Sequence, residues 1–238
     1  MERLHKLVVT MFKNYRVPDL THKLNIIGIN PLDVMVTGVT GAGKSTTLNS
    51  IFQKEVATVG KGVDPETMTL TSYSLNGSFR LWDTPGLGDG IEKDREHSKN
   101  IITLLYKDYS VDDKQHGFID MVLVIIEGSN RDMGTSYKLL NEVIIPNFQK
   151  KRVLVAVNQA DMAMKGRHWD YDNNKPMKKL KDFLEAQVDS IQNRVKEATG
   201  ISIIRPIYYS AEHGYNIDLL LDLLIDNMPN KKRNLVVN

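Results

Sequence analysis

The chain of 238 residues contains no cysteine, which excludes disulfide bonds, metal sites with cysteine ligands and thiol catalysis. It also lacks any apolar run near the ~20 residues of a membrane-spanning helix, and its charged first residues are not typical of a signal peptide. An excess of charge is missing too, because 31 Lys and Arg against 29 Asp and Glu give a net charge of +2. A strong overall attraction to nucleic acid is therefore not expected. The 41% of hydrophobic residues are enough for a full core, and we expect a globular, cytoplasmic protein.

The apolar runs of the chain indicate a mixed α/β fold. Four runs lack polar alternation, as is typical of parallel strands buried on both faces, and they cover residues 32–36, 121–126, 153–157 and 203–209. Asn76-Gly77, between two strand-like runs, favours a type I′ hairpin turn. One helical pattern begins at Ala42, and four others cover residues 96–106, 136–143, 178–198 and 217–224. We predict a mostly parallel six-stranded sheet with helices on both faces and one antiparallel hairpin edge.

The chain divides into three zones that differ in sequence pattern. Residues 1–30 form an N-terminal helical extension, with one apolar helix face made by Leu4, Leu7, Val8, Met11 and Phe12. A second short helix is expected at 19–24, and we expect the pair to pack on the main domain, 31–228, with a membrane-surface or partner-binding helix as the alternative. Residues 229–238 are expected to be a solvated basic tail containing Lys231, Lys232 and Arg233.

A glycine-rich motif directly follows the first apolar run. The segment Gly38-Val-Thr-Gly-Ala-Gly-Lys-Ser45 matches G-x-x-x-x-G-K-[ST]. Glycines let backbone N–H groups converge on a triphosphate, and the helix that follows adds positive potential. We expect Lys44 to reach the β- and γ-phosphates, Ser45 to ligate Mg²⁺, and the Thr46 backbone to lie near the α-phosphate. The other binding positions of the loop are Gly38, Gly41, Ala42 and Gly43.

A second motif, Asp83-Thr-Pro-Gly86, follows the second strand of the predicted hairpin. Asp83 is expected to hold Mg²⁺ through water, and the Gly86 N–H to touch the γ-phosphate. Gly88 and Gly90 make the next segment pliable, as a switch segment needs to be. A threonine upstream is expected to complete the Mg²⁺ shell, and Thr67 is the first choice, with Thr69 and Thr71 as rivals.

Polar residues at the ends of the last two predicted strands indicate a reader of guanine. Asp161, in Asn158-Gln-Ala-Asp161, would accept hydrogen bonds from guanine N1–H and the 2-amino group, a pair of donors that adenine lacks. Asn158 would brace the loop and the base. A backbone N–H of Ser210-Ala211 would meet guanine O6.

These motifs, in this order, resemble the GTPase domain of the Era/TrmE/septin-like group of P-loop GTPases over residues 32–228. The sequence segments GVTGAGKST, LWDTPGLGDG and VNQAD are especially similar to those of bacterial stand-alone GTPases described as ribosome-binding. The resemblance implies a Ras-like fold, binding of Mg²⁺ and of GTP or GDP, and hydrolysis of GTP. It also makes a ribosome one candidate partner.

Three positions depart from the group's pattern. Gln159 replaces a lysine, and Leu87 stands where Ras-like relatives place a water-orienting glutamine. Gly41 occupies the position at which some relatives recruit potassium through an asparagine. We therefore expect slow intrinsic turnover, accelerated by a partner or by a second copy across the nucleotide face. Arg131 is one candidate charge donor, with a salt bridge to Asp132 or a cap far from the phosphates as the alternative.

Two functions of different class remain open. One is an enzyme-switch whose segments are ordered by GTP and released by hydrolysis. The other is a GTP-driven dimerisation or docking module with little hydrolysis, and an ATPase is a third alternative. An insertion at 162–177 adds His168, Trp169 and Tyr171, which either gate the base, bind a partner or belong to a structured surface loop.

Overall fold

The computed structural model describes residues 15–28, 31–56, 58–62, 70–75, 79–111, 113–129 and 133–234. Four features named above therefore lie outside the described residues, namely the first predicted helix, Thr67 with its rival Thr69, the turn at Asn76-Gly77, and Arg131. None of the helices in the described ranges combines the length and the apolarity needed to cross a membrane.

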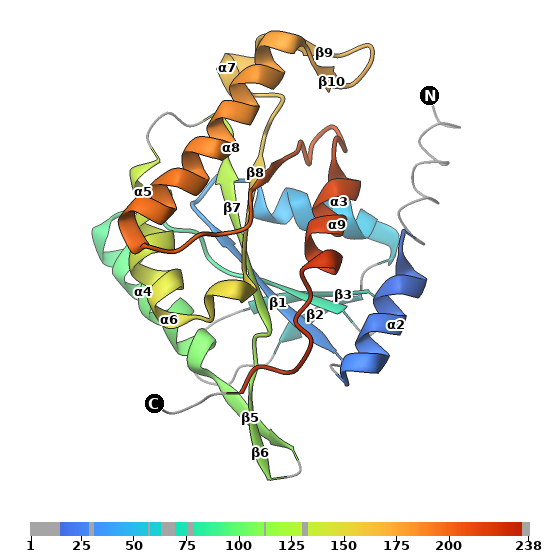
Figure 1. Ribbon diagram of the computed structural model, residues 1–238, viewed down its shortest axis with the longest axis vertical. Coiled ribbons are helices and arrows are strands. Elements are labelled where there is room, and N and C mark those ends of the chain that lie inside the picture. Colours follow the sequence, from blue (N-terminus) through green and yellow to red (C-terminus); the bar gives the residue numbers. More distant parts are fainter. Residues whose placement is uncertain are drawn as a thin grey trace.

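A seven-stranded sheet forms the centre of the molecule (Figure 1), in the order β11-β8-β7-β1-β4-β3-β2. Its parallel strands are β1 (Leu32–Gly38), β4 (Phe79–Asp83), β7 (Met121–Glu127), β8 (Val153–Asn158) and β11 (Ile207–Tyr208). All residues of β1 and β8 are buried, which explains why their sequences are mostly apolar. The predicted mostly parallel α/β sheet is confirmed.

The antiparallel edge of the sheet is also confirmed, and it is longer than predicted. β3 (Leu70–Leu75) pairs with β4, so the predicted hairpin is confirmed. Leu75 lies opposite Phe79, which leaves three residues between the paired positions, one more than the predicted type I′ turn has. β2 (Thr58–Gly62) adds a seventh strand, antiparallel to β3. Glycines at both positions 60 and 62 weaken the strand pattern of this segment in the sequence.

Helices cover both faces of the sheet (Figure 1). One apolar core joins the sheet to α2 (Val17–Ile27), α3 (Lys44–Val56) and α9 (Ile217–Asp226). The other core joins it to α4 (Ile91–Tyr106), α8 (Lys178–Thr199) and the π-helix η1 (Leu139–Ile144). The π-helix lies between two short helices, α5 (Gly134–Lys138) and α6 (Ile145–Asn147), and the 3₁₀ helix η2 (Lys150–Arg152) precedes β8.

The predicted second short helix of the N-terminal extension is α2, and it packs on the main domain. Leu20 and Leu24 are buried in the core that α2 shares with α9. The Arg16 guanidinium lies 2.7 Å from Asp222 and 2.8 Å from Asp226, both in α9. Apolar burial and ion pairs therefore fix this part of the extension.

Two small hairpins extend the molecule at opposite ends (Figure 1). The insertion forms α7 (Ala163–Gly166), β9 (Trp169–Asp170) and β10 (Lys175–Pro176), beside the start of α8. β5 (Asp108–Val111) and β6 (Lys114–Gly117) project at the other end.

The prediction of a solvated basic tail is wrong for Lys232 and Arg233, whereas Lys231 is exposed as expected. Arg233 is buried, its Nε donates to the Ile119 carbonyl at 2.7 Å, and its own carbonyl accepts from Gly117 N–H at 2.7 Å. Lys232 Nζ lies 2.9 Å from the buried carboxylate of Asp120. The Ile119 carbonyl and the Asp120 carboxylate, just before β7, therefore act as acceptors for these two side chains. The basic run alone gives no sign of these acceptors, because they lie far away in the sequence.

Candidate nucleotide-binding site

The predicted phosphate loop connects β1 to α3 at the carboxyl edge of the sheet. Gly41 and Gly43 have positive φ angles of 85° and 80°, a conformation that favours glycine. A Cβ on Gly43 would lie 2.3 Å from Asn158 Nδ2, and one on Gly38 would lie 2.3 Å from the Ile125 carbonyl oxygen. The motif glycines are therefore required both by the turn and by close contact with neighbouring strands.

The Lys44 ammonium folds back over this loop. Its Nζ donates to the carbonyls of Val39 at 3.1 Å and Gly38 at 3.3 Å. Burial lowers the pKa of Lys44, against the opposing effect of Asp83 and Asp89. The ammonium is thus a largely desolvated donor whose present acceptors are neutral carbonyls, and an anion would bind it more strongly.

The loop around Gly86 lies directly against the phosphate loop. A Cβ on Gly86 would lie 2.6 Å from Thr40 N and 2.7 Å from Lys44 Nζ. Thr40 N–H also donates to the Leu87 carbonyl at 2.6 Å. The structure therefore brings the two predicted motifs together, around an open cleft of about 290 Å³ lined by Thr40, Gly41, Lys44, Ser45, Asp83, Thr84, Pro85 and Gly86.

Ser45 and Asp83 form a hydroxyl–carboxylate pair in this cleft. Ser45 Oγ donates to Asp83 Oδ2 at 3.0 Å, and Asp83 Oδ1 is buried without a partner in the described ranges. Burial raises the pKa of Asp83, although Ser45 and Lys44 oppose this effect. Hydroxyl and carboxylate oxygens are the ligands that Mg²⁺ prefers, so the pair and its unsatisfied oxygen fit that cation. No cluster of three or more His, Asp or Glu side chains that could hold a metal occurs among the described residues.

The predicted base-reading residues lie next to the phosphate loop. The Asn158 amide donates to the Ala42 carbonyl at 3.0 Å and accepts from Ala211 N–H at 3.0 Å. Asp161 is buried, its Oδ2 lies 3.7 Å from His213 Nε2, and its Oδ1 has no partner in the part of the chain that the structure describes. Gln159 Nε2 donates to the Gly41 carbonyl at 2.8 Å. One side of the loop thus supports the phosphate loop, while the Asp161 carboxylate keeps an acceptor free.

Both backbone N–H groups predicted for guanine O6 already have acceptors. Ser210 N–H donates to the Tyr215 carbonyl at 3.0 Å, and Ala211 N–H donates to Asn158 Oδ1 at 3.0 Å. The contact of Ser210 or Ala211 with guanine O6 therefore stays a prediction. An O6 contact requires one of these hydrogen bonds to be shared or broken.

The position that follows Gly86 cannot orient water. The Leu87 side chain is fully buried in the core beneath α4, and its backbone forms a bridge with Val39. Two α4 residues that the sequence analysis did not single out hold the loop from the other side. Asp94 Oδ1 accepts from Gly88 N–H at 2.7 Å, and His97 Nδ1 lies 2.8 Å from the Gly86 carbonyl. An aspartate at the start of a helix was the available signal for the first contact.

The aromatic residues of the insertion surround His213. Trp169 is buried and lies 5.8 Å from the His213 ring and 5.2 Å from Tyr215. Tyr171 is exposed and lies 5.8 Å from the His213 ring. His213 faces Asp161, so the insertion is connected to the predicted base site. A gating role for His168, Trp169 or Tyr171 stays a prediction.

A parallel sheet with a glycine loop at its carboxyl edge, a lysine in that loop and an adjoining Asp-x-x-Gly segment define a P-loop nucleotide-binding protein. The chain belongs to the family described as 50S ribosome-binding GTPase, whose match covers residues 33–159. It is therefore a P-loop GTPase of the Era/TrmE type, and GTP binding and hydrolysis are properties of its family.

Similar proteins agree with this assignment. The tRNA modification GTPase MnmE of Bacteroides thetaiotaomicron is 26% identical over 199 residues, which cover 82% of this chain and 39% of that protein. GTPase Der of Thermosipho africanus is 21% identical over 207 residues, covering 86% of this chain and 39% of Der. The chain thus spans about two fifths of the length of these relatives. Toc33 of Arabidopsis thaliana, solved with GDP and Mg²⁺, shares the fold, with a TM-score of 0.63, 17% identity and coverage of 95% and 96% of the two chains.

Proposed function

We propose that this chain is a molecular switch that binds Mg²⁺·GTP in the cleft between the phosphate loop and the Gly86 loop and hydrolyses it to GDP and phosphate. The observation that carries the proposal is the Ser45–Asp83 pair at 3.0 Å, beside the desolvated Lys44 ammonium. A cation ligand pair and a half-buried ammonium in one cleft match the charges of a metal-bound triphosphate.

Each part of the phosphate site has a distinct role in this proposal. Backbone N–H groups from Gly41 to Thr46 surround the phosphates, with Gly38 and Ala42 shaping the loop. Lys44 exchanges its carbonyl acceptors for β- and γ-phosphate oxygens, and the Gly86 N–H contacts the γ-phosphate. Ser45 and Asp83, with Thr67, would hold Mg²⁺, which when bound neutralises charge on the phosphate oxygens.

Guanine is selected by the buried carboxylate of Asp161. Its Oδ1 has no partner among the described residues, so a base that supplies two N–H donors satisfies it and adenine does not. Asn158 holds the base loop to the phosphate loop, and Ser210 and Ala211 form the edge on which the base lies. The Ala211 N–H would then be shared between Asn158 and guanine O6.

Hydrolysis by the isolated chain is slow in this proposal, because the side chain after Gly86 is Leu87 and is buried in the core. Acceleration comes from a partner or from a second copy across the nucleotide face. Single-turnover hydrolysis over a range of protein concentrations tests this, because a rate that rises with concentration identifies the second copy. Arg131→Ala tests one charge donor, which is rejected if the rate at high concentration does not change.

The buried Leu87 also favours a second candidate function, a GTP-dependent assembly or docking module with little hydrolysis. A rate that stays negligible at all concentrations and with added partners supports this module. Recovery of bound proteins from a native lysate with a GTP analogue, compared with GDP, identifies a ribosomal or other partner. Equal recovery with both nucleotides contradicts both GTP-dependent functions.

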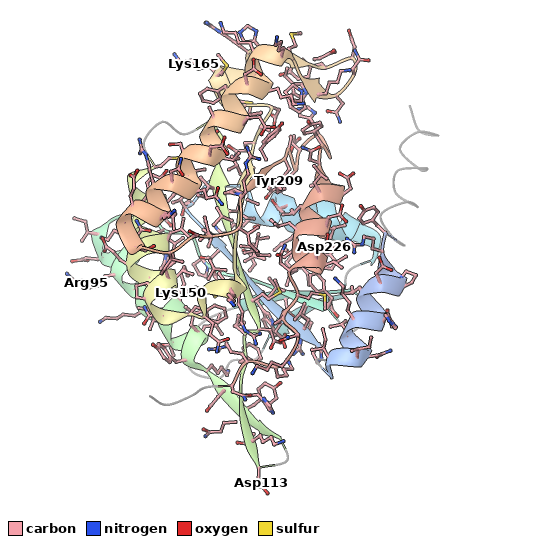
Figure 2. All side chains as sticks on the ribbon, viewed as in Figure 1. Arg95, Asp113, Lys150, Lys165, Tyr209 and Asp226 are labelled. Carbon is pink, nitrogen blue, oxygen red and sulfur yellow. The ribbon has the colours of Figure 1, made fainter. Side chains whose placement is uncertain are left out.

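Lys44→Ala tests both functions, because each requires nucleotide binding. We expect loss of GTP and GDP binding in a titration with a fluorescent nucleotide, since the positive charge that lies over the loop is removed. Lys150→Ala is the matched control, because Lys150 is exposed (Figure 2) and lies in η2, which precedes β8 at the amino end of the strand, whereas the cleft lies at the carboxyl ends of β1 and β4. Competition by ATP at concentrations similar to those of GTP would contradict the role of Asp161.

A further inference from the structure

A short series of hydrogen bonds connects a buried tyrosine to the phosphate loop. Tyr209 directly follows β11, is fully buried and lies in the interior of the molecule (Figure 2). Its hydroxyl oxygen is 2.8 Å from Thr47 Oγ1, in the first turn of α3. Thr47 Oγ1 in turn lies 2.8 Å from the Gly43 carbonyl oxygen. Tyr209 and Thr47 are 162 positions apart in the sequence.

The direction of these bonds follows from the number of protons. A carbonyl oxygen only accepts, so the single hydroxyl proton of Thr47 is donated to Gly43. Tyr209 must therefore donate its proton to Thr47 Oγ1. Burial raises the pKa of Tyr209, so the phenol remains a donor at neutral pH. Both bonds run in one direction, toward Gly43, and such bonds polarise and strengthen each other.

The Gly43 carbonyl is held by further donors. It accepts from Thr47 N–H at 2.8 Å and from Asn158 Nδ2 at 3.4 Å. In a planar trans peptide, the carbonyl and the N–H that follows point in opposite directions. Fixing the Gly43 carbonyl therefore fixes the Lys44 N–H on the opposite side of the peptide, and Lys44 lines the cleft.

We propose that Tyr209 and Thr47 are positioning residues for nucleotide binding, which hold the Gly43–Lys44 peptide with its N–H directed at the phosphates. This inference rests on the proposed binding of GTP in the cleft. The main chain of Tyr209 also holds the base loop, because its carbonyl accepts from Ala160 N–H at 3.0 Å. A single buried residue therefore connects the phosphate loop to the base loop.

Tyr209→Phe removes only the hydroxyl group, and the chain supplies a matched control. The neighbouring Tyr208 donates to Glu185 at 2.9 Å, on α8 and away from the phosphate loop. We expect Tyr209→Phe to weaken binding of a fluorescent GDP by about fivefold, the equivalent of one hydrogen bond, and Tyr208→Phe to change it by less than about twofold. Urea unfolding of each variant without nucleotide measures the structural cost separately. Equal affinities of the two variants, whatever their stabilities, would overturn the proposal.

Changes at Thr47 test the same series of hydrogen bonds, from Tyr209 through Thr47 to the Gly43 carbonyl, at its middle residue. Thr47→Val should weaken GDP binding, Thr47→Ser should restore most of the affinity, and Thr47→Val combined with Tyr209→Phe should cost less than the sum of the two. Because these hydrogen bonds act on the phosphate loop, Tyr209→Phe should lower the affinity for GDP and for IDP by the same factor. IDP lacks the 2-amino group of GDP. A loss confined to GDP, or strict additivity in the double variant, rejects the proposal. Failure of the unmodified protein to bind GDP would instead reject the proposed function.

Discussion

Two carboxylate oxygens of the site are buried without a hydrogen bond to any described residue, Asp83 Oδ1 and Asp161 Oδ1. An unsatisfied buried acceptor costs about 1–3 kcal/mol, and more when it is charged. Asp83 belongs to the predicted cation-binding pair, and Asp161 is the residue predicted to bind the base. Each residue thus has an acceptor that suits the ligand proposed for it, a cation for Asp83 and two N–H donors for Asp161.

Asp161→Asn tests the reading of the base. The amide replaces one acceptor with a donor, so it opposes the N–H groups of guanine and favours a base with a carbonyl at that edge. We expect GDP affinity to fall by about 100-fold or more and XDP affinity to rise, measured by competition with a fluorescent nucleotide. His213→Ala is a useful comparison, because it leaves both carboxylate oxygens in place. A variant at Asp161 that keeps its preference for GDP would contradict the assignment.

Residues of local motifs could be predicted from the sequence, whereas their distant partners could not. Lys44, Ser45 and Asp83 follow from spacing, since the loop and the strand end fix where they lie. The contact of Thr47 with Tyr209 depends on packing across 162 positions, and a threonine in a helix or a tyrosine in a strand carries no signal for it. The same limit applies to the hydrogen bond from Ala211 N–H to Asn158 Oδ1, because these residues are 53 positions apart.

At the scale of the elements, apolar periodicity predicted the parallel strands and the main helices. It was less accurate where proline intervenes. The last strand was expected at 203–209, but the ladder includes only Ile207–Tyr208, because Pro206 has no N–H to donate. The helix expected at 136–143 is divided into α5, η1 and α6, with Pro146 in the last piece, where its ring and missing N–H disturb regular helical bonding.

Glu185→Gln tests the contact between α8 and β11. The Arg205 guanidinium, at 2.7 Å, and the Tyr208 hydroxyl hold the pKa of Glu185 below its ordinary value. A lowered pKa means that this contact stabilises the fold above the ordinary pKa of glutamate and that the contribution is lost as the pH falls through the lowered value. We expect the variant to unfold at lower urea concentration at pH 7, with the difference shrinking as the pH falls below the ordinary pKa of glutamate. A difference that does not depend on pH would contradict the electrostatic explanation.

At the scale of the whole molecule, one end of the sheet carries the candidate nucleotide site and the other is closed by packing around Arg233. The candidate site lies at the carboxyl ends of β1 and β8, whereas the segment around Arg233 closes the opposite end, where β7 begins. Burial lowers the pKa of Arg233 to about 10, so it remains a cation at neutral pH. Its guanidinium lies over the Phe148 ring and above Gly117. Backbone carbonyls rather than a carboxylate satisfy this cation.

Gly117→Ala tests this separation of tasks. A Cβ at Gly117 would lie 2.4 Å from Arg233 Cζ, so the guanidinium must shift relative to its carbonyl partners, and we expect a loss of about 1–3 kcal/mol in the free energy of unfolding. In an Arg233→Ala background the same change should cost little, because the space is then empty. Neither substitution should alter GDP affinity, since both lie at the end of the sheet away from the cleft. Weaker GDP binding by a stably folded Gly117→Ala protein would instead show that the two ends of the sheet are coupled.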